Sequence, residues 1–348
     1  MKRLISAFCL SLFVLFAGFG QSGFTINDLL AVKRVSDPQL SPDGRLVAFT
    51  IGTVDKAANK VVNQIWTVKP DGTGLKFVTP ADKSSSSPRW SPDGKKIAYT
   101  TGGQIWTMDP DGDDKKQVTH ISTGAGNPVW SPDGRLIAFN SDVYPECSND
   151  DCNKAEDEKA EKDKVQAKVT DRLLFRHWVE WRNRKRAHVF IVASGGGVAT
   201  DLTPGDFDAP PYGASTGTDY AFSPDSKEVA FLKNPDKIEA ISTNSDVITL
   251  DIATKSQKNI TVTNKGYDAD PVYTADGKYL LYRSMATEGF EADRWRIMRY
   301  NRATGETVEL TRGFDQQADE ITLSPDGKTI YFVANYHGRQ PVFSVPVE

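Results

Sequence analysis

One short phrase occurs six times in this chain of 348 residues. It reads Ser-Pro-Asp-Gly four times, with the variants Ser-Pro-Asp-Ser and Thr-Ala-Asp-Gly, and its copies start at Ser41, Ser91, Ser131, Ser223, Thr274 and Ser324. The starts are 50, 40, 92, 51 and 50 residues apart. A period of about 40–50 residues indicates one supersecondary unit that is stacked on copies of itself.

Each copy of the phrase is predicted to be a hairpin turn. Proline presets φ for the first turn position, the aspartate side chain can bond the backbone ahead of it, and glycine tolerates positive φ. An apolar or aromatic residue such as Trp90 precedes each phrase, and a β-rich run such as Ile97-Ala98-Tyr99 follows. The phrase is therefore expected to join a first strand to a second strand.

Two further strands are predicted in each repeat. A third strand, such as Ile65-Trp66-Thr67-Val68, is followed by a second turn and by a fourth strand that ends in an apolar residue and a threonine. The five pairs are Val78-Thr79, Val118-Thr119, Leu202-Thr203, Ile260-Thr261 and Leu310-Thr311. Four strands per period predict an all-β protein, a β-propeller of about six four-stranded blades. A β-sandwich with accidental similarity of its turns is the alternative, and six copies in matching context disfavour it.

The 92-residue interval predicts an insertion in blade three, over residues 142–187. Residues 154–169 are rich in Ala, Glu and Lys and contain no Gly or Pro, and Glu158 precedes Lys162 by four positions. This composition and spacing predict a solvated helix.

An aromatic and basic run follows in the same insertion, over residues 175–182. Long insertions in repeat proteins map to loops on one face, which is often the binding face. The alternative is that Trp178 and Trp181 pack the insertion onto the propeller.

The first 20 residues have the pattern of a secretory signal peptide. Lys2 and Arg3 precede an apolar run, and the small residues Gly18 and Gly20 come before a possible cleavage site. We therefore expect a signal peptide over residues 1–20, a propeller over residues 21–348, and a periplasmic or secreted protein without a membrane segment after cleavage.

Two cysteines remain in the expected exported protein, Cys147 and Cys152. Close cysteines in an oxidising compartment most often form a local disulfide. A metal site is the alternative, but two thiols without a neighbouring His or Cys pair are a weak metal signal.

No catalytic residue, metal ligand or cofactor site is predicted in the chain. Residues 213–217 match the G-x-S-x-G motif, but Pro210 and Pro211 precede the match and a predicted strand follows it, whereas a nucleophile elbow needs a strand before it and a helix after it. The net charge of −4 and the absence of a basic excess disfavour a nucleic-acid partner.

The repeats resemble the TolB-like propeller family, and four longer phrases resemble secreted dipeptidyl-peptidase-type members of the prolyl oligopeptidase family. These phrases are residues 28–38, 175–178, 242–246 and 289–295. The resemblance covers essentially all of the chain after the expected signal peptide. It implies an N-terminal propeller that screens peptide substrates for a C-terminal α/β-hydrolase domain with a Ser-Asp-His triad. That hydrolase half is missing from this sequence, so the chain is not expected to be active alone.

Two functions remain open at this point. The first is the propeller portion of an exported peptidase, which gates and positions peptide substrates, and whose last blade has only three predicted strands, at residues 319–323, 329–334 and 341–347. The second is a stand-alone TolB-like scaffold for protein interaction, in which residues 32–36 supply the fourth strand of blade six. The insertion phrases favour the peptidase.

Substrate contacts are expected from charged residues on irregular segments. A carboxylate can hold a peptide amino terminus, and an arginine can hold a carbonyl or carboxylate. The candidates are Glu180, Glu291 and Arg294, with Arg176 and His177 beside them. The alternative is that Glu291, Asp293 and Arg294 form a salt-bridge cluster within a hairpin.

Overall fold

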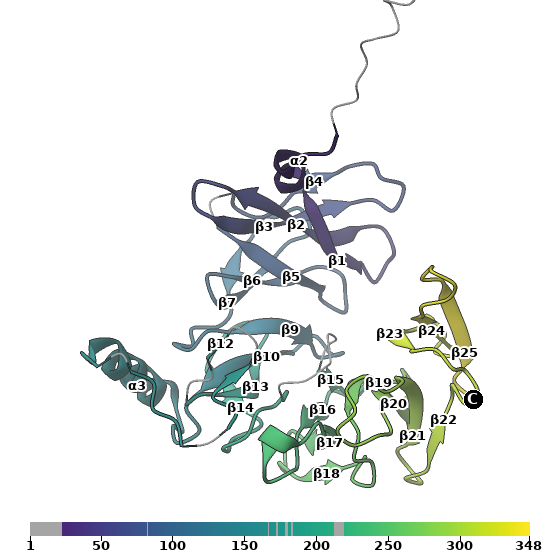
Figure 1. Ribbon diagram of the computed structural model, residues 1–348. Helices are drawn as coiled ribbons and strands as arrows, with labels where there is room; N and C mark the ends of the chain where they lie inside the picture. The colour runs from purple at the N-terminus through teal and green to yellow at the C-terminus, as the bar shows by residue number, and fades with distance from the viewer. Residues whose placement is uncertain are drawn as a thin grey trace, which may run out of the picture.

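The computed structural model describes residues 23–81, 83–165, 167–171, 173–177, 180–181, 184–211 and 219–348. Six antiparallel sheets follow one another around a common centre in the order of the chain (Figure 1). This arrangement confirms the predicted six-bladed all-β propeller. The expected signal peptide, the G-x-S-x-G match and Trp178 lie outside the described residues.

Five blades have four strands, and blade six has three among the described residues. Blade one contains β1 (Arg34–Leu40), β2 (Val47–Asp55), β3 (Lys60–Val68) and β4 (Lys76–Phe77). Blade two contains β5 (Ser85–Trp90), β6 (Ile97–Thr101), β7 (Gln104–Met108) and β8 (Lys116–Gln117). Blade three contains β9 (Gly126–Trp130), β10 (Leu136–Val143), β13 (Arg186–Ala193) and β14 (Thr200–Asp201).

The second half of the ring has the same strand order. Blade four contains β15 (Tyr220–Phe222), β16 (Glu228–Lys233), β17 (Asp246–Asp251) and β18 (Gln257–Asn259). Blade five contains β19 (Asp268–Tyr273), β20 (Tyr279–Ser284), β21 (Arg296–Asn301) and β22 (Thr307–Glu309). Blade six contains β23 (Asp319–Leu323), β24 (Thr329–Val333) and β25 (Val342–Pro346).

The repeated phrase forms the predicted turn between the first and second strand of every blade. Its first hydroxyl donates to the aspartate carboxylate over 2.6–2.7 Å in all six copies. The same carboxylate accepts a backbone N–H two residues later, as from Arg135 to Asp133 over 3.0 Å. The last position has positive φ, +71° at Gly134 and +60° at Ser226. The phrase recurs because the turn needs its hydroxyl, its carboxylate and a last residue that adopts positive φ.

The apolar-Thr pair fixes the fourth strand of each complete blade by two hydrogen bonds, which we call the strand lock. The threonine Oγ1 accepts the backbone N–H of a third-strand residue 14 positions earlier, over 2.9–3.1 Å in all five blades. The apolar residue donates its own N–H to the carbonyl of that same residue, over 2.8–3.1 Å. The third-strand residues of the lock are Ile65, Ile105, Val189, Val247 and Ile297, and each is 0% exposed.

The apolar core is divided among the contacts between consecutive blades. Five clusters of buried side chains each join two neighbouring blades. Between blades one and two, for example, Ile65 of β3 packs with Ile97 and Tyr99 of β6. Each inner blade is therefore apolar on both faces and depends on both of its neighbours.

The proposed role of residues 32–36 as the fourth strand of blade six is wrong. Val32 caps the short helix α2 (Ile26–Ala31), and Arg34 and Ser36 belong to β1, where they pair with Gly52 and Thr50 of β2. The physical reason is that this segment leads directly into the first turn phrase and contains no apolar-Thr pair to form a strand lock.

The insertion in blade three begins after β10 and ends at β13, so it covers residues 144–185 and not 142–187. The insertion is shorter than predicted because the pairing of β10 with β13 continues for two more residue pairs, Asp142 with Ala187 and Val143 with Arg186.

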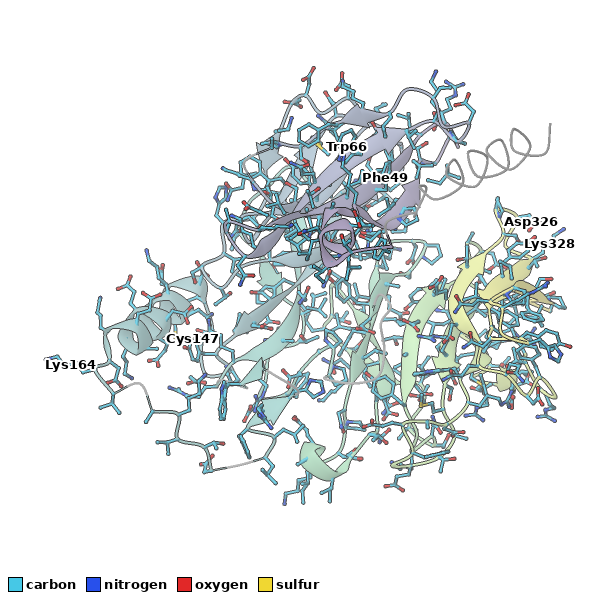
Figure 2. The ribbon with its side chains drawn as sticks, turned by 45° about the horizontal axis from the view of Figure 1, so that its top comes forward. Phe49, Trp66, Cys147, Lys164, Asp326 and Lys328 are labelled. Atoms are coloured by element: carbon cyan, nitrogen blue, oxygen red, sulfur yellow. A yellow bond between two sulfur atoms is a disulfide. The ribbon has the colours of Figure 1, made fainter. Side chains whose placement is uncertain are left out.

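The helix α3 spans Asp150–Lys162 and not residues 154–169 as predicted. It begins earlier because the Asn149 side chain caps it by accepting the N–H of Cys152 over 2.9 Å. The expected pair of Glu158 and Lys162 is present at 3.1 Å. Cys147, which lies beside α3 in Figure 2, forms a disulfide with Cys152.

Replacing a lock threonine should destabilise the fold. In Thr79→Val the buried N–H of Ile65 loses its acceptor, and we expect the free energy of unfolding to fall by about 1–3 kcal/mol. The matched control is Thr53→Val on the exposed side of β2, for which we expect a change within about 0.5 kcal/mol. Urea denaturation measures both variants, and equal losses would contradict the role of the lock.

The turn aspartates should contribute stability that acid removes. The pKa of Asp133 lies below its usual 3.8 because the Ser131 hydroxyl and the Arg135 N–H donate to it. Since the folded pKa is the lower one, this contribution is present above the unfolded pKa and is lost as pH falls through the folded pKa. Ser131→Ala should move the pKa of Asp133 up toward 3.8 in an NMR titration, while the pKa of Asp93 in blade two stays unchanged.

Candidate functional site

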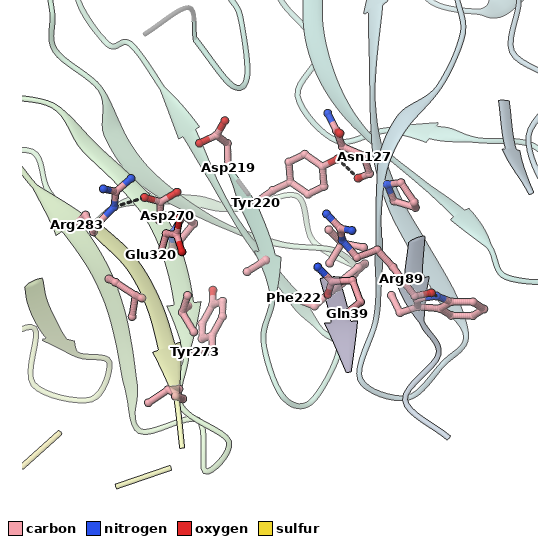
Figure 3. A pocket seen from close by; sticks show the side chains of 18 of the residues that line it. Gln39, Arg89, Asn127, Asp219, Tyr220, Phe222, Asp270, Tyr273, Arg283 and Glu320 are labelled. Atoms are coloured by element: carbon pink, nitrogen blue, oxygen red, sulfur yellow. Dashed lines mark hydrogen bonds and ion pairs between the residues drawn. The ribbon is translucent and has the colours of Figure 1, made fainter. Parts of the chain in front are cut away.

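A cavity of ≈ 1770 Å³ lies where the innermost strands of the blades meet. The first strand of all six blades contributes to its wall, through residues of β1, β5, β9, β15, β19 and β23. Figure 3 shows polar side chains from several blades around this space, among them Arg89, Asp219 and Glu320. We call this cavity the central channel and treat it as the candidate site.

A single repeat position supplies one polar residue per blade to the central channel. It is the fourth residue before each turn phrase, and its six occupants, which we call the channel ring, are Asp37, Ser87, Asn127, Asp219, Asp270 and Glu320. Five of them, all except Asp219, have φ between +51° and +56°, where the first strand is bulged against the second. Bulges re-aim side chains, which explains why the same position lines the channel around the ring.

The lining of the central channel has an excess of negative charge. It contains five carboxylates and two guanidinium groups, so three negative charges are in excess when all are ionised: the groups are Asp37, Asp219, Asp270, Asp319, Glu320, Arg89 and Arg283. A concave space lined by one sign of charge attracts ligands of the opposite sign.

Both arginines bind carboxylates of the channel across blade boundaries. Arg89 of β5 contacts Asp37 of β1 at 2.7 Å. Arg283 of β20 binds Asp270 of its own blade and reaches Asp319 of blade six at 2.8 Å. Its side chain is only 5% exposed. Glu320 is exposed beside this cluster, and it is the ring carboxylate best placed to meet a cationic ligand.

The phrase at residues 289–295 contributes to the channel through its last residue. Trp295 is 4% exposed, and its ring lies 4.5 Å from the guanidinium carbon of Arg283. It also packs edge-on against Tyr267. The tryptophan therefore supports Arg283 by a cation–π contact.

Three of the peptidase-like phrases lie at the same end of the propeller. Each blade is an antiparallel meander, so the connections from second to third strand share one end of the sheets and the turn phrases lie at the other. Residues 175–177, 242–246 and 289–295 fall in or directly after these connections in blades three, four and five. The N–H of Gly289 donates to Thr243 Oγ1 over 2.9 Å, which links two of the connections.

The structure brings together three of the five predicted substrate contacts on blade three. β11 (Arg176–His177) and β12 (Glu180–Trp181) form a small hairpin, in which His177 is paired with Glu180. Trp181 is half exposed, and its ring contacts that of Phe175 in a tilted arrangement with 5.9 Å between the ring centroids.

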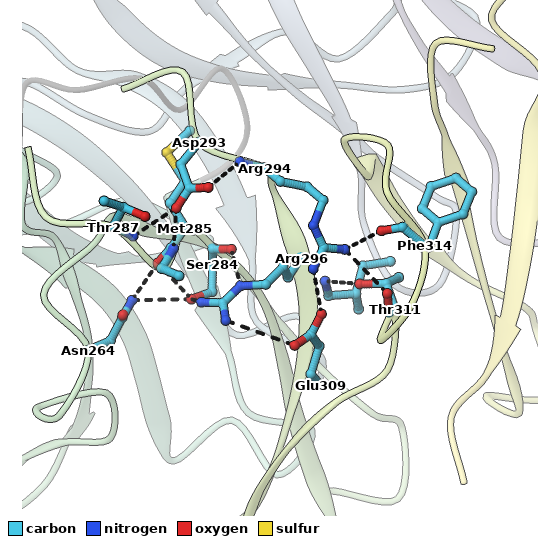
Figure 4. Close-up of polar contacts among 12 residues, drawn as sticks. Asn264, Ser284, Met285, Thr287, Asp293, Arg294, Arg296, Glu309, Thr311 and Phe314 are labelled. Carbon is cyan, nitrogen blue, oxygen red and sulfur yellow. Dashed lines mark hydrogen bonds and ion pairs between the residues drawn. The ribbon is translucent and has the colours of Figure 1, made fainter. Parts of the chain in front are cut away.

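The two remaining predicted contacts lie on blade five, in the connection before β21. Arg294 donates to Glu309 over 2.9 Å and to the carbonyls of Thr311 and Phe314, as Figure 4 shows. Its guanidinium is therefore engaged within the blade. Glu291 is exposed.

Asp293 also has a structural position, because it accepts the backbone N–H groups of Ala286 and Thr287 over 2.9 and 2.7 Å. It does not form the hairpin salt bridge with Arg294 that was considered from the sequence, since the ion-pair partner of Arg294 is Glu309.

The channel ring was missed from the sequence, although a signal was present. A polar residue stands four positions before every turn phrase, and proline follows it in four of the six copies. Aligning the repeats on the phrase and reading upstream finds all six residues.

No group of three or more His, Cys, Asp or Glu residues that could hold a metal occurs in the described ranges. Within the same part of the chain, no helix has the length and apolar character needed to cross a membrane.

Removing Arg283 should destabilise the channel wall. Arg283→Leu leaves the carboxylates of Asp270 and Asp319 close together, and we expect the free energy of unfolding to fall by about 3–5 kcal/mol. Arg283→Leu combined with Asp270→Asn should recover part of the loss. The exposed Arg45 provides the control, since Arg45→Leu should change stability by less than about 1 kcal/mol in the same denaturant titration.

Comparison with known proteins finds relatives over most of the chain, although no family model matches it. Dipeptidyl-peptidase 5 of Porphyromonas gingivalis is 33% identical over 315 residues, which are 88% of this chain and 45% of that protein. Dipeptidyl-peptidase 5 of Porphyromonas endodontalis is 34% identical over 286 residues, 79% of this chain and 40% of that protein. The chain thus spans less than half the length of these relatives.

Solved structures share the fold at lower identity. An acylaminoacyl peptidase in complex with Z-Gly-Gly-Phe-chloromethyl ketone has a TM-score of 0.66 and 16% identity over 91% of this chain and 45% of its own. The β-propeller domain of the Trilobed protease from Pyrococcus furiosus has a TM-score of 0.57 and 14% identity over 90% of this chain and 80% of its own. The resemblance to dipeptidyl peptidases that the longer phrases predicted is confirmed: the chain is a homologue of the dipeptidyl-peptidase 5 proteins, and the part it shares with them contains this six-bladed β-propeller.

Proposed function

We propose that this propeller admits extended peptides into its central channel and positions them for a peptidase domain of the kind found in its relatives. The observation that carries the proposal is the channel ring, which places one polar side chain of each blade around one cavity. The relatives' name, dipeptidyl-peptidase, supports a peptide as the ligand.

The size of the channel favours extended chains over folded proteins. A sphere with the volume of the cavity, ≈ 1770 Å³, has a radius of roughly 7.5 Å, whereas a folded domain of 100 residues has a radius of gyration of about 13 Å. A peptide strand fits such a space, and a folded domain is excluded from it.

The charge of the channel favours peptides that carry positive charge. Arg89 and Arg283 are already engaged by Asp37, Asp270 and Asp319, so the excess negative charge remains for the ligand. An amino terminus or a lysine side chain can bind the exposed Glu320 by a charge-assisted hydrogen bond.

The proposed peptide path also includes the connections between second and third strands, which lie at the end of the blades opposite the turn phrases. Glu180 and Glu291 remain our candidates for holding a peptide amino terminus, together with Arg176 and His177. Arg294 is the weakest of the five candidates, because Glu309 and two carbonyls already bind its guanidinium.

We also propose that the protein acts outside the cytoplasm. The signal-peptide pattern of residues 1–20 supports this location, and the disulfide between Cys147 and Cys152 is of the kind that persists in oxidising compartments.

Fluorescence anisotropy with labelled octapeptides tests the role of the channel. We expect a lysine-containing peptide to bind this chain more tightly than a glutamate-containing peptide of the same length. Glu320→Gln should weaken binding of the lysine peptide by about two- to fivefold, the range of a partly exposed ion pair. Glu306→Gln, at an exposed turn of blade five outside the channel, is the matched control and should leave binding unchanged.

Equal binding of the two peptides, or equal effects of the two variants, would refute the channel as the peptide site. Tight binding of a folded protein that neither variant alters would instead support the interaction scaffold.

A further inference from the structure

A cluster of buried polar side chains lies where blade four meets blade five. The peptidase-like phrase at residues 242–246 ends in Asn244, Ser245 and Asp246, which are 2%, 0% and 0% exposed. Asp268, the first residue of β19 in blade five, is also 0% exposed. The end of this phrase is therefore buried, and a contact with a peptide in solution does not account for its residues.

The backbone brings these residues together from two segments. The N–H of Asp268 donates to the carbonyl of Ser245 over 2.8 Å, and Ser245 forms a parallel bridge with Tyr267. Because side chains alternate along extended segments, Asn244, Asp246 and Asp268 lie on one side of this bridge. The carboxylates of Asp246 and Asp268 interact electrostatically. One amide and two carboxylates are thus gathered at the boundary between the blades.

The oxygen atoms of this cluster are only partly hydrogen-bonded. Asn244 Oδ1 and Asp268 Oδ2 are buried and have no hydrogen-bond partner among the described residues. The other oxygen of Asp268 accepts the side-chain N–H of Asn264 over 2.9 Å. Buried polar atoms in native proteins almost always have a partner, and an atom without one indicates a bound ion or water.

The negative charge of the cluster is not balanced within the described chain. The donors to Asp246 are the uncharged side chains of Asn259 and Thr261. Lys233 is paired with Asp246 in the strand register, but its ammonium lies 3.7 Å from the ring centroid of Phe207. Neither buried carboxylate has an ion-pair partner among the described residues. A buried charge is costly unless it is paired or coordinates a metal.

The arginine on the blade-five side is also bound to other groups. Arg296 donates to Ser284 Oγ over 3.0 Å and lies 3.9 Å from Glu309, as Figure 4 shows. The amide of Asn264 donates to Ser284 over 3.2 Å as well as to Asp268. Asn264 therefore connects the two networks without adding a positive charge to the cluster.

We propose that Asp268, Asp246 and Asn244 bind a calcium ion between blades four and five. All three residues supply oxygen, and Ca²⁺ takes carboxylate and amide oxygens in flexible geometry, whereas Mg²⁺ requires a near-ideal octahedron and Zn²⁺ favours nitrogen and sulfur. Two carboxylates balance the charge of one divalent ion. Since an amide is the third ligand, the site differs from the clusters of three His, Cys, Asp or Glu residues that the described ranges lack.

The ion joins two connections that carry peptidase-like phrases. Asn244 directly follows Thr243, whose Oγ1 accepts the N–H of Gly289 over 2.9 Å. Asn264, which donates to Asp268, also donates to the carbonyl of Met285 at the end of blade five that carries residues 289–295. The site is separate from the central channel, so its test does not depend on the proposed function.

Calorimetry and urea unfolding of the full chain test the site. After treatment with EDTA, the chain should bind one Ca²⁺. The equilibrium constant of unfolding should fall about 100-fold when free Ca²⁺ is at 100 times its dissociation constant. Mg²⁺ at the same concentration should stabilise less. NaCl at matched ionic strength controls for charge screening and should not reproduce the effect.

Three variants identify the ligands. Asp268→Asn keeps the shape of the side chain and removes one charge, so it should abolish the response to Ca²⁺. Asp111→Asn, at an exposed turn of blade two, is the matched control and should keep the full response. Asn244→Ala keeps both carboxylates and should weaken Ca²⁺ binding at least about tenfold. Circular dichroism verifies that each variant is folded.

Three results would overturn the proposal. The first is a chain that neither binds Ca²⁺ nor is stabilised by it, which would assign the cluster to a buried water or a protonated carboxyl group. The second is an unchanged response to Ca²⁺ in Asp268→Asn or in Asn244→Ala. The third is equal stabilisation by NaCl at the same ionic strength.

Discussion

The packing of one blade against the next is the interaction on which the whole structure depends. Each sheet is apolar on both faces, so no blade can bury its side chains alone. One position on the second strand shows this clearly: Ala48 and Ala98, beneath the next blade, are 0% exposed, whereas the equivalent Tyr331 of blade six is 44% exposed. The radial order of the blades follows from this requirement.

Two sets of local hydrogen bonds make each blade a unit of constant shape. The turn phrase fixes the first hairpin, and the strand lock fixes a fourth strand of only two or three residues. The ends of the blades can then differ. Tight turns occupy one end, while the opposite end carries the longer connections, including α3 and the hairpin of β11 and β12. Three of the four peptidase-like phrases fall in or directly after these connections, which the constant part of the fold supports.

The fold was predictable because its determinants are local and repeated. The side chains that stabilise the turn all belong to the turn phrase itself. Each blade contains one such phrase, so its six copies were sufficient to count the blades. The assignment of residues 32–36 failed because a first strand and a fourth strand have similar apolar alternation, and only the lock threonine distinguishes them. The start of α3 was missed because the cap is made by the single side chain of Asn149. The cluster around Arg283 could not be predicted from the sequence, because Asp319 joins it from another blade, 36 positions away.

The channel ring has a consequence for how such proteins diverge. Five of its six residues stand at bulges, where the strand ladder is already interrupted, and none of the six side chains is part of the apolar clusters between blades. At the ring positions outside the ion pairs of Arg89 and Arg283, such as Glu320, a substitution can change the charge or size of the channel while the apolar contacts between the blades remain intact. The charge of the channel and the apolar packing of the blades are therefore encoded at different residues, and under the proposed function a few single substitutions would change the preferred peptide without disturbing that packing.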